Sequence, residues 1–126
     1  MQRKVFTAAG AVSVGPYSHA VEAGGFVYLS GQTPMDSSTK KLADGGITGQ
    51  TKQCFVNLGN VLDAAGLNMD NVVKVTVFLT DMANFPAMND VYKEQFTAPY
   101  PARSTVGVKE LPLGALVEIE MTASRN

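Results

Sequence analysis

Two stretches of this chain have the spacing of an amphipathic helix, and each carries a single apolar stripe. In the first, residues 47–65, apolar residues recur every three or four positions, and Gly66 follows as a left-handed cap. In the second, Asp81 or Asn84 is placed to cap the helix, and its stripe consists of Phe85, Met88, Tyr92 and Phe96. Two helices with one apolar stripe each cover one face of a β-sheet and leave the other face open.

The sheet is predicted by six segments rich in alternating or β-branched residues. Gly24 and Gly25 form a hairpin turn between the second and third segments. Residues 33–46 have no period and many turn formers, which predicts a surface loop. The six predicted strands are residues 4–7, 18–23, 26–30, 72–79, 103–108 and 115–123.

The order of these elements, β-β-β-α-β-α-β-β, predicts an α+β fold: a two-layer sandwich of a mixed sheet with both helices on one face. A chain of 126 residues suits a single domain spanning 1–126. In the last strand, Leu116, Glu118 and Glu120 share the face that the helices leave open. We expect alternate residues of 72–79 to add apolar surface there. Since only 17% of the residues are charged, we expect another subunit to cover this face.

Charge and composition argue against several classes of function. The net charge is -1 and the ten Lys and Arg residues are scattered, so we expect no nucleic-acid partner. One histidine and one cysteine are too few for a zinc site or a disulfide, and the glycines lack the spacing of a phosphate loop. We therefore expect no metal, no disulfide and no bound nucleotide. Cys54 lies on the stripe of the first helix, which favours a buried, unreactive thiol. No stretch resembles a secretory signal or a membrane span, which favours a cytoplasmic protein without membrane contact.

Arg103 is the residue with the most informative chemistry. It stands at the start of a predicted strand in an otherwise apolar sheet, where a permanent positive charge needs an anion. The guanidinium binds a carboxylate through two parallel hydrogen bonds. Its partner is therefore either an internal acid such as Glu118 or the carboxylate of a small bound molecule, and both readings can hold together.

Four motifs in this order resemble the RidA family. They are residues 14–20 (VGPYSHA), 29–34 (LSGQTP), 101–108 (PARSTVGV) and 111–120 (LPLGALVEIE). The resemblance extends over nearly the whole chain. It implies a chorismate-mutase-like fold and a homotrimer in which the sheets pack around a central β-barrel, with three sites in the clefts between subunits.

The same resemblance implies an enzyme: a hydrolase that deaminates reactive enamines and imines, such as 2-aminoacrylate, 2-iminopropionate and 2-iminobutyrate. The products are a 2-keto acid and ammonia, and no cofactor takes part. Pyridoxal-phosphate enzymes that dehydrate serine or threonine release such substrates, which implies a functional link to them.

The resemblance also implies roles for single residues. Arg103 matches the arginine that binds the substrate carboxylate, Glu118 the acid that holds the attacking water, and Tyr17 the phenol that lines the pocket and relays a proton. Ser30 and Gly31 match the turn that positions the substrate.

Two further positions match the family less closely. Thr105 stands where many members have cysteine, and a role of its backbone survives that exchange whereas a role of a thiol does not. Asn89 matches a position near the cleft, but it lies on a helix whose polar face is solvated by default.

The residues also allow other interpretations. Tyr17 fits a turn aromatic that fills a gap, Ser30 a turn former, and Glu118 a structural partner of Arg103. The alternative function is a non-catalytic protein that binds 2-keto acids or related metabolites in the same cleft. A ribonuclease, a function attached to some relatives, is disfavoured because the basic patch and the histidine pair are missing.

Overall fold

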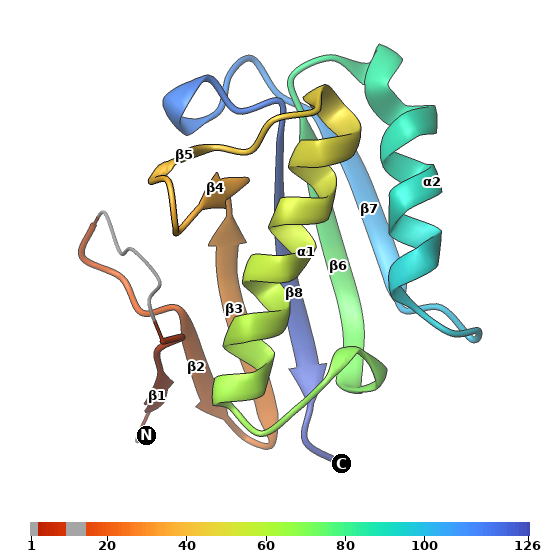
Figure 1. Cartoon of the computed structure of the whole chain (residues 1–126). Helices are drawn as coiled ribbons and strands as arrows, with labels where there is room; N and C mark the ends of the chain where they lie inside the picture. Colours follow the sequence, from red (N-terminus) through yellow and green to blue (C-terminus); the bar gives the residue numbers. More distant parts are fainter. Residues whose placement is uncertain (1–2, 10–14) are drawn as a thin grey trace.

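Figure 1 shows the computed structural model, which describes residues 3–9 and 15–126: a sheet with both long helices on the same side. Helix α1 spans Gly46–Ala64 and α2 spans Phe85–Gln95. The main sheet is built from β1 (Lys4–Phe6), β2 (Ala20–Ala23), β3 (Phe26–Gln32), β6 (Val72–Leu79), β7 (Ala102–Gly107) and β8 (Val117–Ser124). A small hairpin, β4 (Met35–Asp36) with β5 (Lys41–Leu42), and three short 3-10 turns, Met69–Asn71, Met82–Asn84 and Pro112–Gly114, complete the described elements.

The strand order in the sheet is β1-β2-β3-β8-β6-β7. Neighbouring strands are antiparallel except β6 and β7, which are parallel because α2 carries the chain back between them. The sheet is therefore mixed, as the order of predicted elements indicated. Strand β7 is its edge and β6 lies one place inside it.

The apolar core fills the space between this sheet and the two helices. Strand β8 alternates throughout, and β6 alternates from Lys74 onward, after an irregularity in register between Val72 and Lys74, so every second residue there points at the helices and is buried. The core includes Val75, Val77 and Leu79 from β6, Val117, Ile119 and Met121 from β8, Phe55, Leu58 and Leu62 from α1, and Met88, Val91 and Tyr92 from α2. The predicted α+β fold with a mixed sheet and two helices is thus confirmed.

Three local predictions need correction. Residues 33–46 contain the β4–β5 hairpin, whose two-residue strands are too short to produce a visible period. The side chain of Asp36 closes the turn of this hairpin by accepting hydrogen bonds from the backbone N–H and the hydroxyl of Ser38.

The other two corrections concern the predicted caps of α2. The side chain of Asp81 caps the 3-10 turn Met82–Asn84 rather than α2, and Asn84 at the start of α2 makes no side-chain cap.

The face of the sheet away from the helices differs from the prediction in one strand. Because Val75, Val77 and Leu79 face the helices, this strand presents Lys74, Thr76 and Phe78 to the open face, so the expected apolar row is largely polar. Exposed apolar side chains on this face come instead from β1, β3 and β7: Val5, Phe26, Tyr28 and Val106, each at least 41% exposed.

Across residues 3–9 and 15–126, no helix is long and apolar enough to cross a membrane.

Candidate active site

Strand β3 carries a β-bulge where the candidate site begins. Leu29 pairs with Met121 and Gln32 with Ile119, so Ser30 and Gly31 together lie opposite one residue of β8. The hydroxyl of Ser30 donates a hydrogen bond of 2.6 Å to the carbonyl of Ser18, which ties the bulge to the chain that leads into β2.

The carboxylate of Glu118 lies directly against this bulge. A Cβ atom built on Gly31 would come within 2.6 Å of Glu118 Oε2, so a glycine is required for the carboxylate to occupy this place. Partial burial raises the pKa of Glu118 above its ordinary value of 4.5, and the negative charge of Glu120 adds to the increase. Glu118 is therefore a stronger base than an exposed glutamate.

Glu118 and Gly31 open into a cavity of about 710 Å³ that also takes in Tyr17 and Ser30. The phenol of Tyr17 is 45% exposed, so this side chain does not plug a gap in the core. We call Tyr17, Ser30, Gly31 and Glu118 the carboxylate cluster. It brings together an acceptor of protons, two hydroxyl groups and a glycine backbone, which is what water activation beside a small polar substrate needs.

A second group of the predicted residues surrounds Arg103, which points to the helix side of the sheet because its register partner in β6 is the buried Val75. Nη1 of Arg103 donates a hydrogen bond of 2.7 Å to Asn89 Oδ1 on α2. The Arg103 guanidinium carbon lies 4.5 Å from the centre of the Tyr92 ring and 5.4 Å from that of Phe85, so both aromatic rings stabilise the charge.

We call Arg103, Asn89 and Thr105 the arginine cluster. Thr105 lies on the same side of β7, opposite the buried Val77, and its buried hydroxyl has no hydrogen-bond partner within the described part of the chain. Strand β7 is an edge of the sheet, and the N–H of Val108 donates to the carbonyl of Leu79 in β6. Because alternate residues of a parallel strand face its neighbour, the backbone N–H and C=O of Thr105 point outward, away from β6. Arg103 and Asn89 border a hollow of about 420 Å³ that also includes Tyr100 and Tyr92, and Thr105 lies outside its lining.

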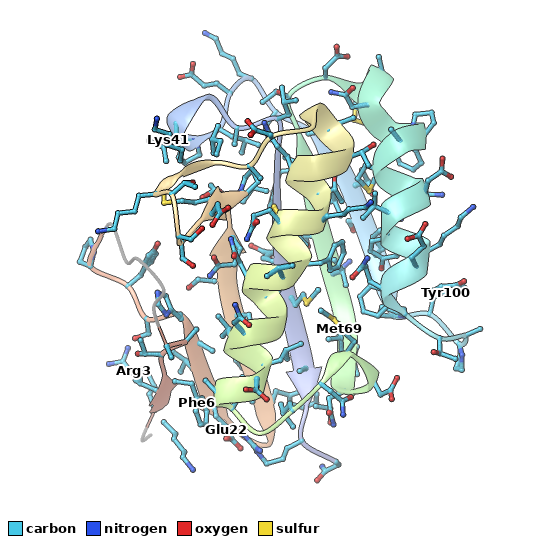
Figure 2. All side chains as sticks on the ribbon, in the orientation of Figure 1. Arg3, Phe6, Glu22, Lys41, Met69 and Tyr100 are labelled. Atoms are coloured by element: carbon cyan, nitrogen blue, oxygen red, sulfur yellow. The ribbon has the colours of Figure 1, made fainter. Side chains whose placement is uncertain are left out.

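The two clusters are far apart within one chain. Glu118 points to the open face of the sheet and Arg103 to the helix face. Arg103 on β7 pairs with Val75 on β6, and Val75 pairs with Met121 on β8. Arg103 is therefore two strands away from β8, at the level of a residue three positions after Glu118. Standard strand spacings place their Cα atoms about 14 Å apart. In Figure 2, Tyr100, which lines the hollow beside Arg103, lies on the right of the molecule, and Lys41 of β5 lies on the upper left.

The prediction that Glu118 is an internal partner of Arg103 is therefore wrong. The partner inside the chain is Asn89, a neutral amide that fixes the guanidinium without neutralising it. A signal for this was present in the sequence, because Asn89 lies four residues after Phe85 and three before Tyr92 and thus on the apolar stripe of α2.

The remaining reactive side chains do not join either cluster. The thiol of Cys54 is buried, as predicted, and donates to the carbonyl of Gln32; burial raises the pKa of Cys54, which disfavours the thiolate. His19 is also buried, and its Nδ1 accepts a hydrogen bond of 3.3 Å from the backbone N–H of Ala8. Within residues 3–9 and 15–126, His, Cys, Asp and Glu form no group of three that could hold a metal ion.

Comparison with known proteins gives consistent matches over most of the chain. The profile of the family described as Endoribonuclease L-PSP matches residues 8–125. A Dermatophagoides farinae protein named 2-iminobutanoate/2-iminopropanoate deaminase is 51% identical over 107 residues, which cover 85% of this chain and 84% of that protein.

Solved structures agree with this match. The crystal structure of RidA from an Antarctic Psychrobacter species has a TM-score of 0.91 at 40% identity and covers 97% of this chain and 99% of its own. The structure of E. coli TdcF with bound serine has a TM-score of 0.92 at 35% identity, covering 98% of this chain and 99% of that one.

Proposed function

This chain belongs to the RidA family, the proteins matched by the Endoribonuclease L-PSP profile, and we propose that it hydrolyses reactive 2-imino acids to 2-keto acids and ammonia. The substrates are 2-iminopropionate, the tautomer of 2-aminoacrylate, and 2-iminobutyrate. The name of the 51% identical relative supports this choice. So does the serine bound to TdcF, because serine is a small molecule with a carboxylate and a nitrogen on adjacent carbons.

The observation that carries the proposal is the place of Glu118. Its carboxylate lies in a cavity beside Tyr17 and Ser30, with a pKa raised by burial and by Glu120. A base with a raised pKa accepts a proton from water more readily at neutral pH, which is the step that hydrolysis of an imine requires.

The chemistry needs only water and proton transfers. Water attacks the carbon of the protonated imine while Glu118 takes one proton from it, giving a neutral carbinolamine. Glu118 then returns that proton to the amino nitrogen, directly or through the phenol of Tyr17. The C–N bond then breaks and releases ammonia, while the carboxylate of Glu118 accepts the proton of the carbinol O–H and the carbonyl forms. That proton passes from Glu118 to the ammonia, so one imine cation and one water become one 2-keto acid and one ammonium ion.

This reaction is supported without a cofactor, because a protonated imine is already electrophilic. Holding substrate and water in place supplies several kcal/mol, roughly seven or more in the best cases. We expect enzymes that release 2-imino acids, such as pyridoxal-phosphate dehydratases of serine or threonine, to supply the substrate. A cytoplasmic location stays a prediction from the sequence.

Arg103 enters the proposal through assembly. The guanidinium of Arg103 can bind the substrate carboxylate through two parallel hydrogen bonds. Arg103 and Glu118 face opposite sides of one sheet, however. The proposal therefore includes a homotrimer in which the arginine cluster of one subunit meets the carboxylate cluster of the next. The exposed apolar side chains Val5, Tyr28 and Val106 support this arrangement, since subunit packing around a central barrel would bury them.

The activity is tested by coupling the protein to a serine or threonine dehydratase and following the release of 2-keto acid. We expect the protein to accelerate release from the imine, and heat-denatured protein to have no effect. If folded protein accelerates no imine but still binds 2-keto acids, the alternative of a non-catalytic metabolite-binding protein replaces this proposal.

The shared cleft is tested separately by mixing two inactive variants, Arg103→Lys and Glu118→Gln, and letting their subunits exchange. Random exchange of equal amounts gives about a quarter of the clefts one intact arginine cluster and one intact carboxylate cluster, so activity returns to about that level. Each variant exchanged with itself is the control. No recovery from variants that assemble normally would place the whole site within one chain.

The family description names a ribonuclease, which we do not propose. The only histidine, His19, is buried, and the net charge of -1 offers no basic surface for a phosphate backbone.

A further inference from the structure

Leu113 has a position that packing does not explain. It lies in the turn Pro112–Gly114 just before β8, and at 63% it is the most exposed large apolar side chain in the part of the chain that the structure describes. Its φ of 62° places it in the left-handed region, where a Cβ atom is crowded and glycine is normally found. A leucine here is therefore exposed to water and strained at the same time.

The turn that holds Leu113 is closed by backbone hydrogen bonds. The N–H of Gly114 donates to the carbonyl of Leu111 and that of Ala115 to the carbonyl of Pro112, both at 3.2 Å. Pro112 restricts the chain on one side of Leu113. The direction of the leucine side chain is thus set by the backbone, and strain of this kind is typically kept where a side chain has a task.

This side chain borders the same cavity as the carboxylate cluster. Leu113 and Pro112 line it together with Tyr17 and Glu118, and Glu118 follows only five residues later on β8. Of the other aliphatic lining residues, Ala9, Pro16 and Pro112 are exposed but smaller, Met35 is half-buried and Ala8 is buried. Leu113 therefore presents the largest exposed aliphatic group beside the proposed catalytic base.

A 2-imino acid has three groups around its reacting carbon, and the proposed function has assigned two of them. The carboxylate is bound by Arg103, and the imine nitrogen and attacking water are handled by Glu118 and Tyr17. The third group is a hydrocarbon side chain, which gains free energy from an apolar neighbour. The cavity of about 710 Å³ has room for more than a methyl group.

We infer that Leu113 determines substrate specificity by contacting the side chain of the imino acid, and that it favours aliphatic side chains of two carbons or more. This inference rests on the proposed function. It narrows the substrate class from 2-imino acids in general to those with longer aliphatic side chains.

The test compares imines with side chains of increasing length, made in place by an amino-acid oxidase from alanine, 2-aminobutyrate and leucine. The measured quantity is kcat/KM for each imine relative to the imine from alanine. In wild type this ratio rises with side-chain length. In Leu113→Ala the ratio for the leucine imine falls about tenfold or more, the range that loss of a few apolar groups from a pocket produces. Leu113→Met keeps most of the apolar surface and keeps the ratio within about twofold of wild type.

Leu113→Gly separates the side chain from the backbone. It removes the same contact as Leu113→Ala but relieves the strain at φ 62°, so it should melt at a higher temperature than the alanine variant and show the same loss of preference.

An unchanged ratio in the alanine or glycine variant would overturn the inference. So would an equal decrease for all three imines, since that would make Leu113 a structural support of Glu118. If wild type accelerates none of the three imines, the proposed function itself fails and this inference fails with it.

Discussion

The carboxylate cluster and the arginine cluster are built in opposite ways. Ser30 and Gly31 lie in a β-bulge, and Glu118 has its place only because Gly31 has no side chain. Arg103, by contrast, lies in a regular strand and is held by side chains of a regular helix, through one hydrogen bond to Asn89 and the rings of Tyr92 and Phe85.

This difference bears on what each cluster tolerates. A catalytic group that is positioned by the backbone is disturbed when side-chain atoms are added next to it. A catalytic group that is positioned by neighbouring side chains is disturbed when atoms of those side chains are removed. The carboxylate cluster should therefore be sensitive to substitutions that enlarge, and the arginine cluster to substitutions that remove. Four substitutions probe the two clusters: Arg103→Lys and Gly31→Ala test the comparison directly, and Glu118→Gln and Glu120→Gln test the charge of the carboxylate cluster.

The largest effect is expected for Arg103→Lys. An ammonium group cannot make the hydrogen bond to Asn89 and hold a carboxylate at two points, so kcat/KM should fall about a thousandfold. The measurement is steady-state kinetics with 2-iminopropionate, with circular dichroism to verify the fold. Activity within a few fold of wild type in a folded variant would remove Arg103 from the site.

Glu118→Gln should rank second, with kcat about a hundredfold lower, because the amide keeps the shape but accepts no proton. Binding of the 2-keto acid product, measured by calorimetry, should stay close to wild type. If rate and product binding fall together, Glu118 is a structural support and not the base.

The same variant gives a test of stability. The pKa of Glu118 in the folded protein lies above the ordinary value of 4.5. Ionisation of Glu118 therefore lowers the free energy of unfolding, and this loss develops as the pH rises from 4.5 through the pKa of the folded state. Glu118→Gln removes this cost. It should therefore gain melting temperature relative to wild type near pH 8 and not near pH 4; an equal change at both pH values would contradict the raised pKa.

Gly31→Ala tests the backbone side of the comparison. The added methyl group would meet the end of a flexible side chain, so the fold should persist while the Glu118 carboxylate moves aside. Displacing the Glu118 carboxylate from its place beside the substrate should lower kcat about tenfold. The matched control is Gly15→Ala, where an added Cβ meets nothing within 4 Å. Equal losses in both variants would show that the contact with Glu118 is not the cause.

The smallest effect is expected for Glu120→Gln. It removes the negative charge that contributes to the raised pKa of Glu118, so this pKa falls and the acidic limb of the kcat/KM profile moves to lower pH. The plateau at neutral pH should change less than in any of the other three variants. An acidic limb that stays in place would show that Glu118 does not set it.

The elements of the fold follow largely from the sequence. The stripes of both helices, the positive φ of Gly66 after α1, and the alternation of β8 all appear in the structure as predicted. These features depend on interactions between residues a few positions apart, so a single sequence contains them. The β4–β5 hairpin was missed because its strands have two residues each and no period.

The candidate site likewise follows in part from the sequence and in part only from the tertiary structure. The sequence by itself determined which residues have the chemistry: a forked cation at Arg103, an acid at Glu118, and a serine and a glycine where β3 becomes irregular. Only the tertiary structure decided that Arg103 and Glu118 face opposite sides of the sheet and that Asn89 is the partner of the arginine. The register between β7, β6 and β8 sets these relations, and register arises from packing between segments far apart in the chain, which local sequence patterns do not encode.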